Sequence, residues 1–233
     1  MKAVLLAAGE GTRLHPLTLT TPKCLVPING KPLIDYWLEM LVPCDEIDEI
    51  FINVSYLKEQ VIDHISNKWQ GCNKIFLWQE NKLLGTAGTL KANYSQLKDD
   101  DIMVIHADNL SAFDLRQFIN AHKTRLISCK ITMMLFKTDC PSQCGIVELD
   151  NTGLVIDMHE KVKKPPGNLA NGAVYIFEKS VIDLIYHNNS YDISLDVIPN
   201  FLGHICSWLN SNYHRDIGSP ESYSLAQKEL LLK

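Results

Sequence analysis

The sequence predicts an α/β fold built on one mainly parallel, mixed sheet, and two patterns carry this prediction. Through the first 135 residues, short apolar segments typical of strands alternate with segments whose apolar residues recur at helical spacing. This βαβ alternation is typical of a parallel sheet with helices on both faces, which makes a three-layer sandwich. Short strands around turn residues follow in the rest of the chain, so we expect a hairpin to join the sheet there.

Each expected element rests on its local pattern. Short apolar runs predict strands at residues 4–8, 49–54, 74–78, 102–106 and 130–136. Helical spacing predicts helices at residues 33–41, 57–69, 86–94 and 115–122, and Pro32 suits the start of the first. Strands are expected next at residues 145–149, 154–158 and 173–177, with Asn151-Thr152-Gly153 as a hairpin turn. Helices at residues 180–186 and 195–202, a strand pair and a closing helix at 220–232 complete the series, and residues 161–167 form an exposed basic loop.

The composition is that of a globular protein with one sizeable core. Its 233 residues are 46% apolar and 21% charged, so one domain is expected. The formal net charge of -5 disfavours a nucleic acid or an anionic membrane as a partner, because both select broad positive surfaces. No apolar run approaches the roughly 18 residues of a membrane span, and the opening apolar run is too short for a signal peptide. We therefore expect a cytoplasmic protein, whose oligomeric state, monomer or homo-oligomer, stays open.

The cysteines and histidines form no metal-binding pattern. Seven cysteines contain no Cys-x-x-Cys pair, and the close pair Cys140 and Cys144 has no second pair nearby. The eight histidines are scattered, without His-Glu-x-x-His spacing. We expect reduced cysteines and no structural zinc.

The segment after the first strand has the residues of a phosphate-binding loop. Gly9 and Gly11 let the backbone turn sharply and leave peptide N–H groups to point at an anion. Arg13 and Lys23 add positive charge close by. From these residues alone, a tight turn with two surface cations is an equally good interpretation.

Two other glycine-rich loops are excluded by spacing. A Walker loop needs four residues between its glycines, and a dinucleotide-binding fold needs a third glycine that opens a helix. Neither is present, and four prolines, at positions 16, 22, 27 and 32, exclude one continuous helix over residues 12–32. We expect a long ordered loop.

Other candidate residues follow later strands, where ligands bind in open α/β sheets. Asp108 suits magnesium, which prefers carboxylates together with phosphate oxygens, although a helix cap or an Asx turn is the better interpretation from the residue alone. Asp216 is explained by a glycine turn before a helix that starts at Pro220. Glu160 and Lys161 form an adjacent acid and base, which is commonly a solvated pair. Gly85 either lets a base approach the backbone or shapes the entry of a helix.

A family resemblance joins these segments. The string Leu6-Ala7-Ala8-Gly9-Glu10-Gly11-Thr12-Arg13-Leu14, with Pro16-Leu17-Thr18 and Pro22-Lys23 after it, resembles the opening of the sugar-1-phosphate nucleotidyltransferases. Asp-Ile-Gly-Ser-Pro at 216–220 is similar to the family's Asp-Ile-Gly-Thr-Pro. The resemblance implies a glycosyltransferase-A-like, Rossmann-like fold in a single domain over residues 1–233. Its nucleotide-binding part would cover about 1–135 and its sugar-phosphate-binding part about 136–233.

The resemblance also implies a role for each residue. Asp108 and Asp216 would be ligands of Mg²⁺, although Ala107 stands where the family usually has glycine, and Arg13 and Lys23 would be catalytic cations. The residues implied to contact the nucleotide are Leu6, Ala7, Ala8, Gly9, Gly11, Thr12, Arg13, Lys23, Glu80, Gly85 and Thr86. Those implied to contact the sugar phosphate are Gly145, Glu160, Lys161 and Asn171.

The implied reaction is magnesium-dependent transfer of a nucleotidyl group from a nucleoside triphosphate to a sugar-1-phosphate. Glu80, five residues before Gly85, takes the family's base-reading position, whereas Gln79 would point to the opposite face of the strand. A carboxylate only accepts hydrogen bonds, which suits the N–H groups of guanine better than the edge of uracil or thymine. GTP is therefore favoured, and in this family guanine goes with mannose or a manno-configured heptose.

Other functions stay open. They are uridylyl or thymidylyl transfer to another sugar-1-phosphate, cytidylyl transfer to an alcohol phosphate, and non-catalytic binding of a nucleotide sugar by a regulatory protein. Ala107 favours the regulatory protein, whereas the retained charged residues favour an enzyme. No hexapeptide-repeat tail is present, so we expect no second activity.

Overall fold

The computed structural model describes residues 1–229. The chain divides into two compact units. The first unit contains Met1–Leu83, Ile105–Ala112 and the segment from Tyr213 onward, and the second contains Leu84–Val104 and Phe113–Asn212. Residues far apart in the sequence therefore belong to the same unit.

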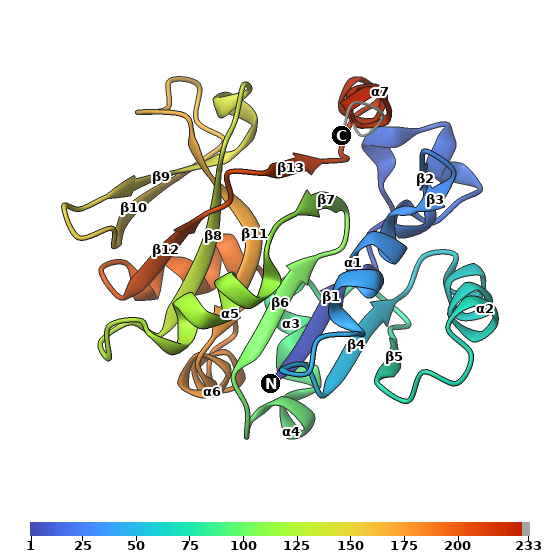
Figure 1. The fold of residues 1–233 in the computed structure, drawn as a ribbon, viewed down its shortest axis with the longest axis horizontal. Coiled ribbons are helices and arrows are strands. Elements are labelled where there is room, and N and C mark those ends of the chain that lie inside the picture. Colours follow the sequence, from blue (N-terminus) through green and yellow to red (C-terminus); the bar gives the residue numbers. More distant parts are fainter. Residues whose placement is uncertain (230–233) are drawn as a thin grey trace. The chain divides into compact units, whose positions relative to one another are not determined.

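The first unit contains the expected parallel strands. β1 (Lys2–Leu6), β4 (Glu49–Val54) and β5 (Ile75–Gln79) lie side by side with β4 in the middle (Figure 1). The register pairs Leu6 with Asn53 and Asn53 with Trp78, so the carboxyl ends of the three strands lie at one edge. β6 (Ile102–His106) passes from the second unit into the first.

Two expected helices pack in this unit. α1 (Leu33–Leu41) has the predicted bounds and buries an apolar face, and α2 (Lys58–Lys68) is one residue shorter at each end than predicted. Asp35 of α1 is fully buried and accepts hydrogen bonds from Lys68 Nζ (3.0 Å) and Trp69 Nε1 (2.8 Å), with His64 Nε2 at 2.9 Å. Burial raises the pKa of Asp35, but the hydrogen bonds from these three partners outweigh it, so the pKa lies below its usual value.

The end of the chain packs against its beginning within the first unit. β7 (Asn109–Ala112) pairs antiparallel with β13 (Tyr213–Asp216), and α7 (Pro220–Glu229) follows. The short hairpin of β2 (Pro27–Ile28) and β3 (Lys31–Pro32) lies nearby, because Ile28 joins Leu110, Ile217 and Ala226 in one apolar cluster. Residues 230–232 of the predicted closing helix lie outside the described residues.

The second unit contains the antiparallel strands. β11 (Leu169–Phe177) pairs with β8 (Ile131–Lys137) and with β9 (Gly145–Leu149), which forms a hairpin with β10 (Val155–Glu160). The predicted turn is present between β9 and β10, where Asp150 Oδ1 accepts from the N–H groups of Thr152 and Leu154. β12 (Ile205–Leu209) adds to β8 in parallel. The predicted α/β fold with a mixed sheet is thus confirmed.

The helices of the second unit are α3 (Thr86–Ala92), α4 (Tyr94–Leu97), α5 (Leu115–Lys123) and α6 (Lys179–His187). The helix predicted near residues 195–202 is present only as two short helical turns, not as one α-helix. The chain there forms a π-helical turn, η5 (Ile193–Val197), and then a 3₁₀ turn, η6 (Ile198–Phe201), in which Pro199 lacks a backbone donor. The two strands predicted before the last helix are present as β12 and β13, but they do not pair with each other, because β12 pairs with β8 whereas β13 pairs with β7.

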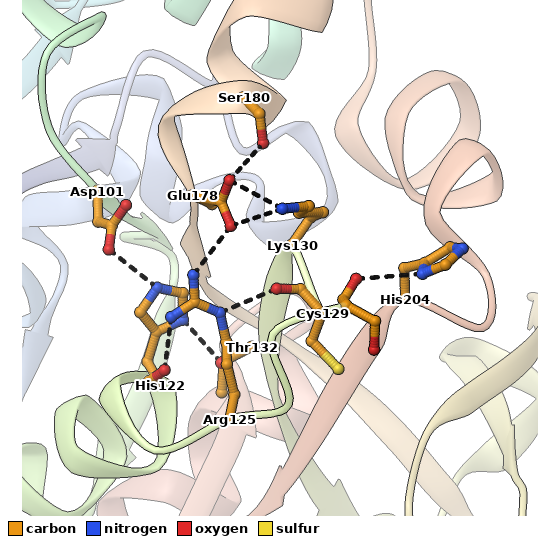
Figure 2. A network of polar contacts seen from close by, with 10 residues as sticks. Asp101, His122, Arg125, Cys129, Lys130, Thr132, Glu178, Ser180 and His204 are labelled. Atoms are coloured by element: carbon orange, nitrogen blue, oxygen red, sulfur yellow. Dashed lines mark hydrogen bonds and ion pairs between the residues drawn. The ribbon is translucent and has the colours of Figure 1, made fainter.

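Figure 2 shows a polar network in the second unit. His122 Nδ1 lies 2.8 Å from Thr132 Oγ1, and Nε2 lies 3.3 Å from Asp101 Oδ2. Burial lowers the pKa of His122, although Asp101 opposes the shift. Nearby, Glu178 accepts from Arg125 Nη2 (3.2 Å) and Lys130 Nζ (3.1 Å), and Arg125 also donates to backbone carbonyl groups (Figure 2). These contacts connect α5, β8 and the start of α6.

Within residues 1–229, no helix combines the length and the apolar character required to span a membrane. None of the seven cysteines, all of which lie within the described residues, forms a disulfide bond.

Candidate active site

The glycine loop after β1 is ordered by its own residues. β1 ends at Leu6, and Gly11 has a φ of 66°, a conformation that favours glycine. A Cβ atom there would lie 3.0 Å from Cβ of Lys23 and 3.1 Å from Cγ2 of Thr18. Thr18 Oγ1 donates to the Gly11 carbonyl at 2.7 Å. The predicted absence of a continuous helix is correct, because residues 12–25 contain three separate 3₁₀ turns, η1 (Thr12–Leu14), η2 (Leu17–Leu19) and η3 (Lys23–Leu25).

Four charged residues singled out from the sequence come together in the first unit. Lys23 is buried, at 7% exposure, and its Nζ lies 2.6 Å from Asp108 Oδ2 and 3.7 Å from Asp216 Oδ1. Arg13 Nη2 lies 3.7 Å from Asp216 Oδ2. The two aspartates thus converge on one ammonium group.

The pairing of β7 with β13 brings the two aspartates together. Asp108 directly precedes β7 and Asp216 ends β13, and the register pairs Asn109 with Asp216. The Ile217 N–H donates to the Asp108 carbonyl at 3.1 Å, which continues the pairing by one step. Long-range strand pairing therefore joins two aspartates that lie far apart in the sequence.

Gly218 completes this cluster. A Cβ atom at Gly218 would lie 2.5 Å from Asp216 Oδ2 and 2.9 Å from Arg13 Nη2. Any side chain at this position would displace the carboxylate or the guanidinium. The string Asp-Ile-Gly-Ser-Pro indicated a turn here but not this close approach.

The charges around Asp108 keep its carboxylate ionised. Burial raises the pKa of Asp108, but the charges of Lys23 and His106 and the Lys23 hydrogen bond outweigh it, so the pKa lies below its ordinary value. Burial lowers the pKa of the neighbouring His214 to about 3, so this imidazole is neutral near pH 7. Asp108 is therefore an anion at neutral pH.

Two converging carboxylates fit a magnesium ion. Magnesium is held in nucleotide enzymes by one or two carboxylates together with phosphate oxygens, and an ionised Asp108 beside Asp216 would supply the protein part of that set. In the second unit, side-chain atoms of Glu148, Asp157 and His159 lie within 4.8 Å of one another. There, His159 Nε2 lies 2.7 Å from Glu148 Oε1, which an ordinary surface hydrogen bond explains.

The predicted base-reading residue is buried at the carboxyl end of β5. Glu80 is 7% exposed, whereas Gln79 is exposed on the other face, as the strand alternation predicts. Asn53 Nδ2 donates to Glu80 Oε1 at 2.9 Å, and Asn53 Oδ1 accepts from the Ala7 N–H at 2.7 Å. Asn53 was not predicted from the sequence, where it is one of two polar residues in an otherwise apolar strand.

Gly85 and Thr86 lie in the second unit, at the start of α3. Gly85 has a φ of 80°, and a Cβ atom there would collide with the Tyr191 carbonyl. Thr86 Oγ1 accepts from the Ile193 N–H at 2.7 Å, and the Ala87 N–H donates to the Tyr191 carbonyl at 3.0 Å. The segment before η5 therefore fixes the loop that contains the two predicted residues.

The predicted sugar-phosphate residues also lie in the second unit. A Cβ atom at Gly145 would lie 2.5 Å from Glu160 Oε2, and Lys161 Nζ lies 3.0 Å from Glu160 Oε1. Asn171 Nδ2 donates to the buried Tyr175 hydroxyl at 2.7 Å. Gly145, Glu160 and Lys161 are thus close together, and Asn171 is held by Tyr175, a residue that was not selected from the sequence pattern.

A family model for nucleotidyl transferases matches residues 2–232. The chain belongs to the nucleotidyl transferase family. This family member is 30% identical over 234 residues to the mannose-1-phosphate guanylyltransferase of Mycobacterium tuberculosis, covering 98% of the chain and 64% of that relative. It is 32% identical over 215 residues to the UTP–glucose-1-phosphate uridylyltransferase of Synechocystis, covering 87% of the chain and 55% of that relative.

A solved structure of HddC from Yersinia pseudotuberculosis, complexed with GMP-PN, matches this nucleotidyl transferase with a TM-score of 0.80. The identity is 27%, and the match covers 98% of this chain and 99% of the other. The chain spans only 64% and 55% of the lengths of the two curated relatives described above.

Proposed function

We propose that this chain transfers a nucleotidyl group from a nucleoside triphosphate to a sugar-1-phosphate and releases pyrophosphate. The observation that carries this proposal is the convergence of Asp108 and Asp216 on Lys23, with Arg13 beside them, next to the glycine loop. Such a cluster combines cations for phosphate groups with two anions for a metal ion. The family match supports the same reaction class.

The residues of the first unit would bind and orient the triphosphate. Arg13 and Lys23 supply positive charge to its phosphates, and Asp108 and Asp216 would hold Mg²⁺, which neutralises charge on the phosphates when it is bound. A phosphate oxygen of the sugar phosphate attacks the α-phosphorus as the bond to pyrophosphate breaks. No protein nucleophile is needed, because the attacking phosphate is already ionised at neutral pH.

The residues of the second unit would bind the sugar phosphate. Glu160 accepts hydrogen bonds from sugar hydroxyls, Lys161 meets the phosphate, and Asn171 both donates and accepts. Gly145 leaves room for the Glu160 carboxylate, because a Cβ atom at this position would lie 2.5 Å from Oε2.

We propose GTP as the nucleotide and mannose-1-phosphate or a manno-configured heptose-1-phosphate as the acceptor. Glu80 supports guanine because a carboxylate accepts from its N–H groups. The guanylyltransferase relative and the GMP-PN complex of HddC point the same way. The uridylyltransferase relative favours UTP with glucose-1-phosphate as the second candidate.

The deciding experiment measures pyrophosphate release for five nucleoside triphosphates against several sugar-1-phosphates and phosphocholine, with Mg²⁺ and with chelator. We expect the highest kcat/KM with GTP and a manno-configured sugar phosphate, and none after chelation. Turnover only with CTP and phosphocholine would indicate alcohol-phosphate cytidylyl transfer. Nucleotide binding by calorimetry without any turnover would instead indicate a regulatory protein.

A further inference from the structure

Asn53 connects two predicted nucleotide contacts through one buried side chain. It lies near the carboxyl end of β4, between β1 and β5, and is 4% exposed. Its Oδ1 accepts from the Ala7 N–H at 2.7 Å, and its Nδ2 donates to Glu80 Oε1 at 2.9 Å. One amide group thus links the start of the glycine loop to the base-reading carboxylate.

The orientation of this amide follows from chemistry. A backbone N–H can only donate, so the atom of Asn53 that faces Ala7 must be the oxygen. The NH₂ group must then face residue 80. In this buried setting, rotating the amide would leave two donors opposed at Ala7 and two acceptors opposed at Glu80, and each unsatisfied buried group is costly.

The fixed NH₂ group restricts what residue 80 can offer. It requires an acceptor from residue 80 at the Oε1 position, and Glu80 supplies one. A glutamine at this position would also have to turn its carbonyl toward Asn53, which would place its own NH₂ group where Glu80 has Oε2. The exchange of Glu80 for glutamine would therefore replace an acceptor by a donor at the second position, with no rotational freedom to restore it.

We propose that Asn53 is a positioning residue that sets nucleobase preference by fixing which hydrogen-bonding group residue 80 presents. The inference rests on the proposed function, in which Glu80 meets the base. It goes further in assigning the selectivity to a pair of residues, so that the effect of a change at position 80 depends on position 53.

The test compares E80Q with the double variant N53D/E80Q. In the double variant the aspartate accepts both from the Ala7 N–H and from the glutamine amide, so the glutamine turns its carbonyl to the second position. The variant pair keeps one negative charge and nearly the same volume, which preserves the packing. N120D, at an exposed position of α5, is the control for adding a carboxylate.

We expect E80Q to lower the GTP to UTP ratio of kcat/KM roughly tenfold or more, because an N–H group of guanine would then face another donor. N53D/E80Q should recover most of that ratio, and N120D should leave it unchanged. The preference for GTP over UTP, measured as the ratio of dissociation constants by calorimetry, should change among the variants in the same way. This binding measurement also tests the inference if the chain binds nucleotides without turnover.

The outcomes separate the inference from the proposed function. If the double variant keeps the ratio of E80Q, Asn53 does not orient residue 80 and the inference is overturned, while base reading by Glu80 stands. If E80Q itself leaves the ratio unchanged, Glu80 does not meet the base, and both the base assignment and the inference fall. The reaction class is tested independently by pyrophosphate release.

Discussion

Nζ of Lys23 lies 2.6 Å from Oδ2 of Asp108, and the lysine side chain is only 8% exposed whereas the aspartate is 37% exposed. A buried ammonium group needs a compensating anion, because its desolvation is costly. Asp108 therefore has a structural role toward Lys23 in addition to the proposed metal-binding role. These two roles can be separated by experiment.

Asp108→Asn should reduce both activity and stability. The substitution removes the anion at 2.6 Å and leaves the Lys23 ammonium facing Asp216 Oδ1 at 3.7 Å. We therefore expect the free energy of unfolding to fall by about 1–3 kcal/mol. Urea denaturation measures the stability, and magnesium-dependent pyrophosphate release measures the activity, which should fall at least roughly hundredfold. Asp63→Asn, on the exposed face of α2, is the matched control. Near-normal turnover in Asp108→Asn would remove the metal assignment.

Gly218→Ala should impair the charged cluster by steric contact alone. The added methyl group would lie 2.5 Å from Asp216 Oδ2 and 2.9 Å from Arg13 Nη2, so one of these groups must move. We expect kcat/KM to fall by at least roughly tenfold, equivalent to ~1.4 kcal/mol, and half-saturation to require more Mg²⁺. Gly167→Ala is the control, because a Cβ atom there meets nothing within 4 Å. Equal magnesium dependence in the two variants would argue against this interpretation.

The sequence predicted those parts of the fold that local patterns determine. α1, β4, β6 and β9 have the predicted bounds, because each is one periodic or apolar segment with clear ends. Local patterns do not determine which strands pair with one another. Pairing of β13 with β7 depends on residues a hundred positions apart, and no local pattern distinguishes it from pairing with β12.

The candidate site shows the same division. Asp108 and Asp216 were selected by a family resemblance, and the strand pairing brings them together. Asn53 and Gly218 were missed because each matters through its close contact with the side chain of a residue far away in the sequence. Spacing in one sequence carries no signal for such a contact.

Gly145→Ala should weaken binding of the sugar phosphate selectively. Its methyl group would lie 2.5 Å from Glu160 Oε2, so the carboxylate must leave its position beside Lys161. We expect KM for the sugar-1-phosphate to rise by roughly tenfold, with KM for the nucleotide changed by less than about twofold. Initial rates at varied concentrations of each substrate provide the internal control. A parallel rise in both KM values would contradict the assignment of Gly145 and Glu160 to the sugar phosphate.

His122 should make the protein less stable below neutral pH. Its pKa is lowered in the fold, chiefly by burial, so the unfolded chain binds the proton more readily. The stability from neutral His122 is therefore complete above the unfolded pKa of about 6.5 and declines below it, by at most about 1.4 kcal/mol per pH unit. The pKa of Asp101 is also lowered, chiefly by its hydrogen bond to His122, so further stability is lost at more acidic pH.

The measurement for His122 is the free energy of unfolding from urea titrations at pH 7.5 and near pH 5. His122→Gln removes the titrating group, so the difference between the two pH values should become smaller than in the unmodified protein, whatever the change at pH 7.5. His187→Gln, at an exposed position of α6, should leave the difference unchanged. An unaltered pH dependence in His122→Gln would show that other groups cause the acid sensitivity, because a buried neutral imidazole that must gain a proton on unfolding cannot be removed without changing the slope.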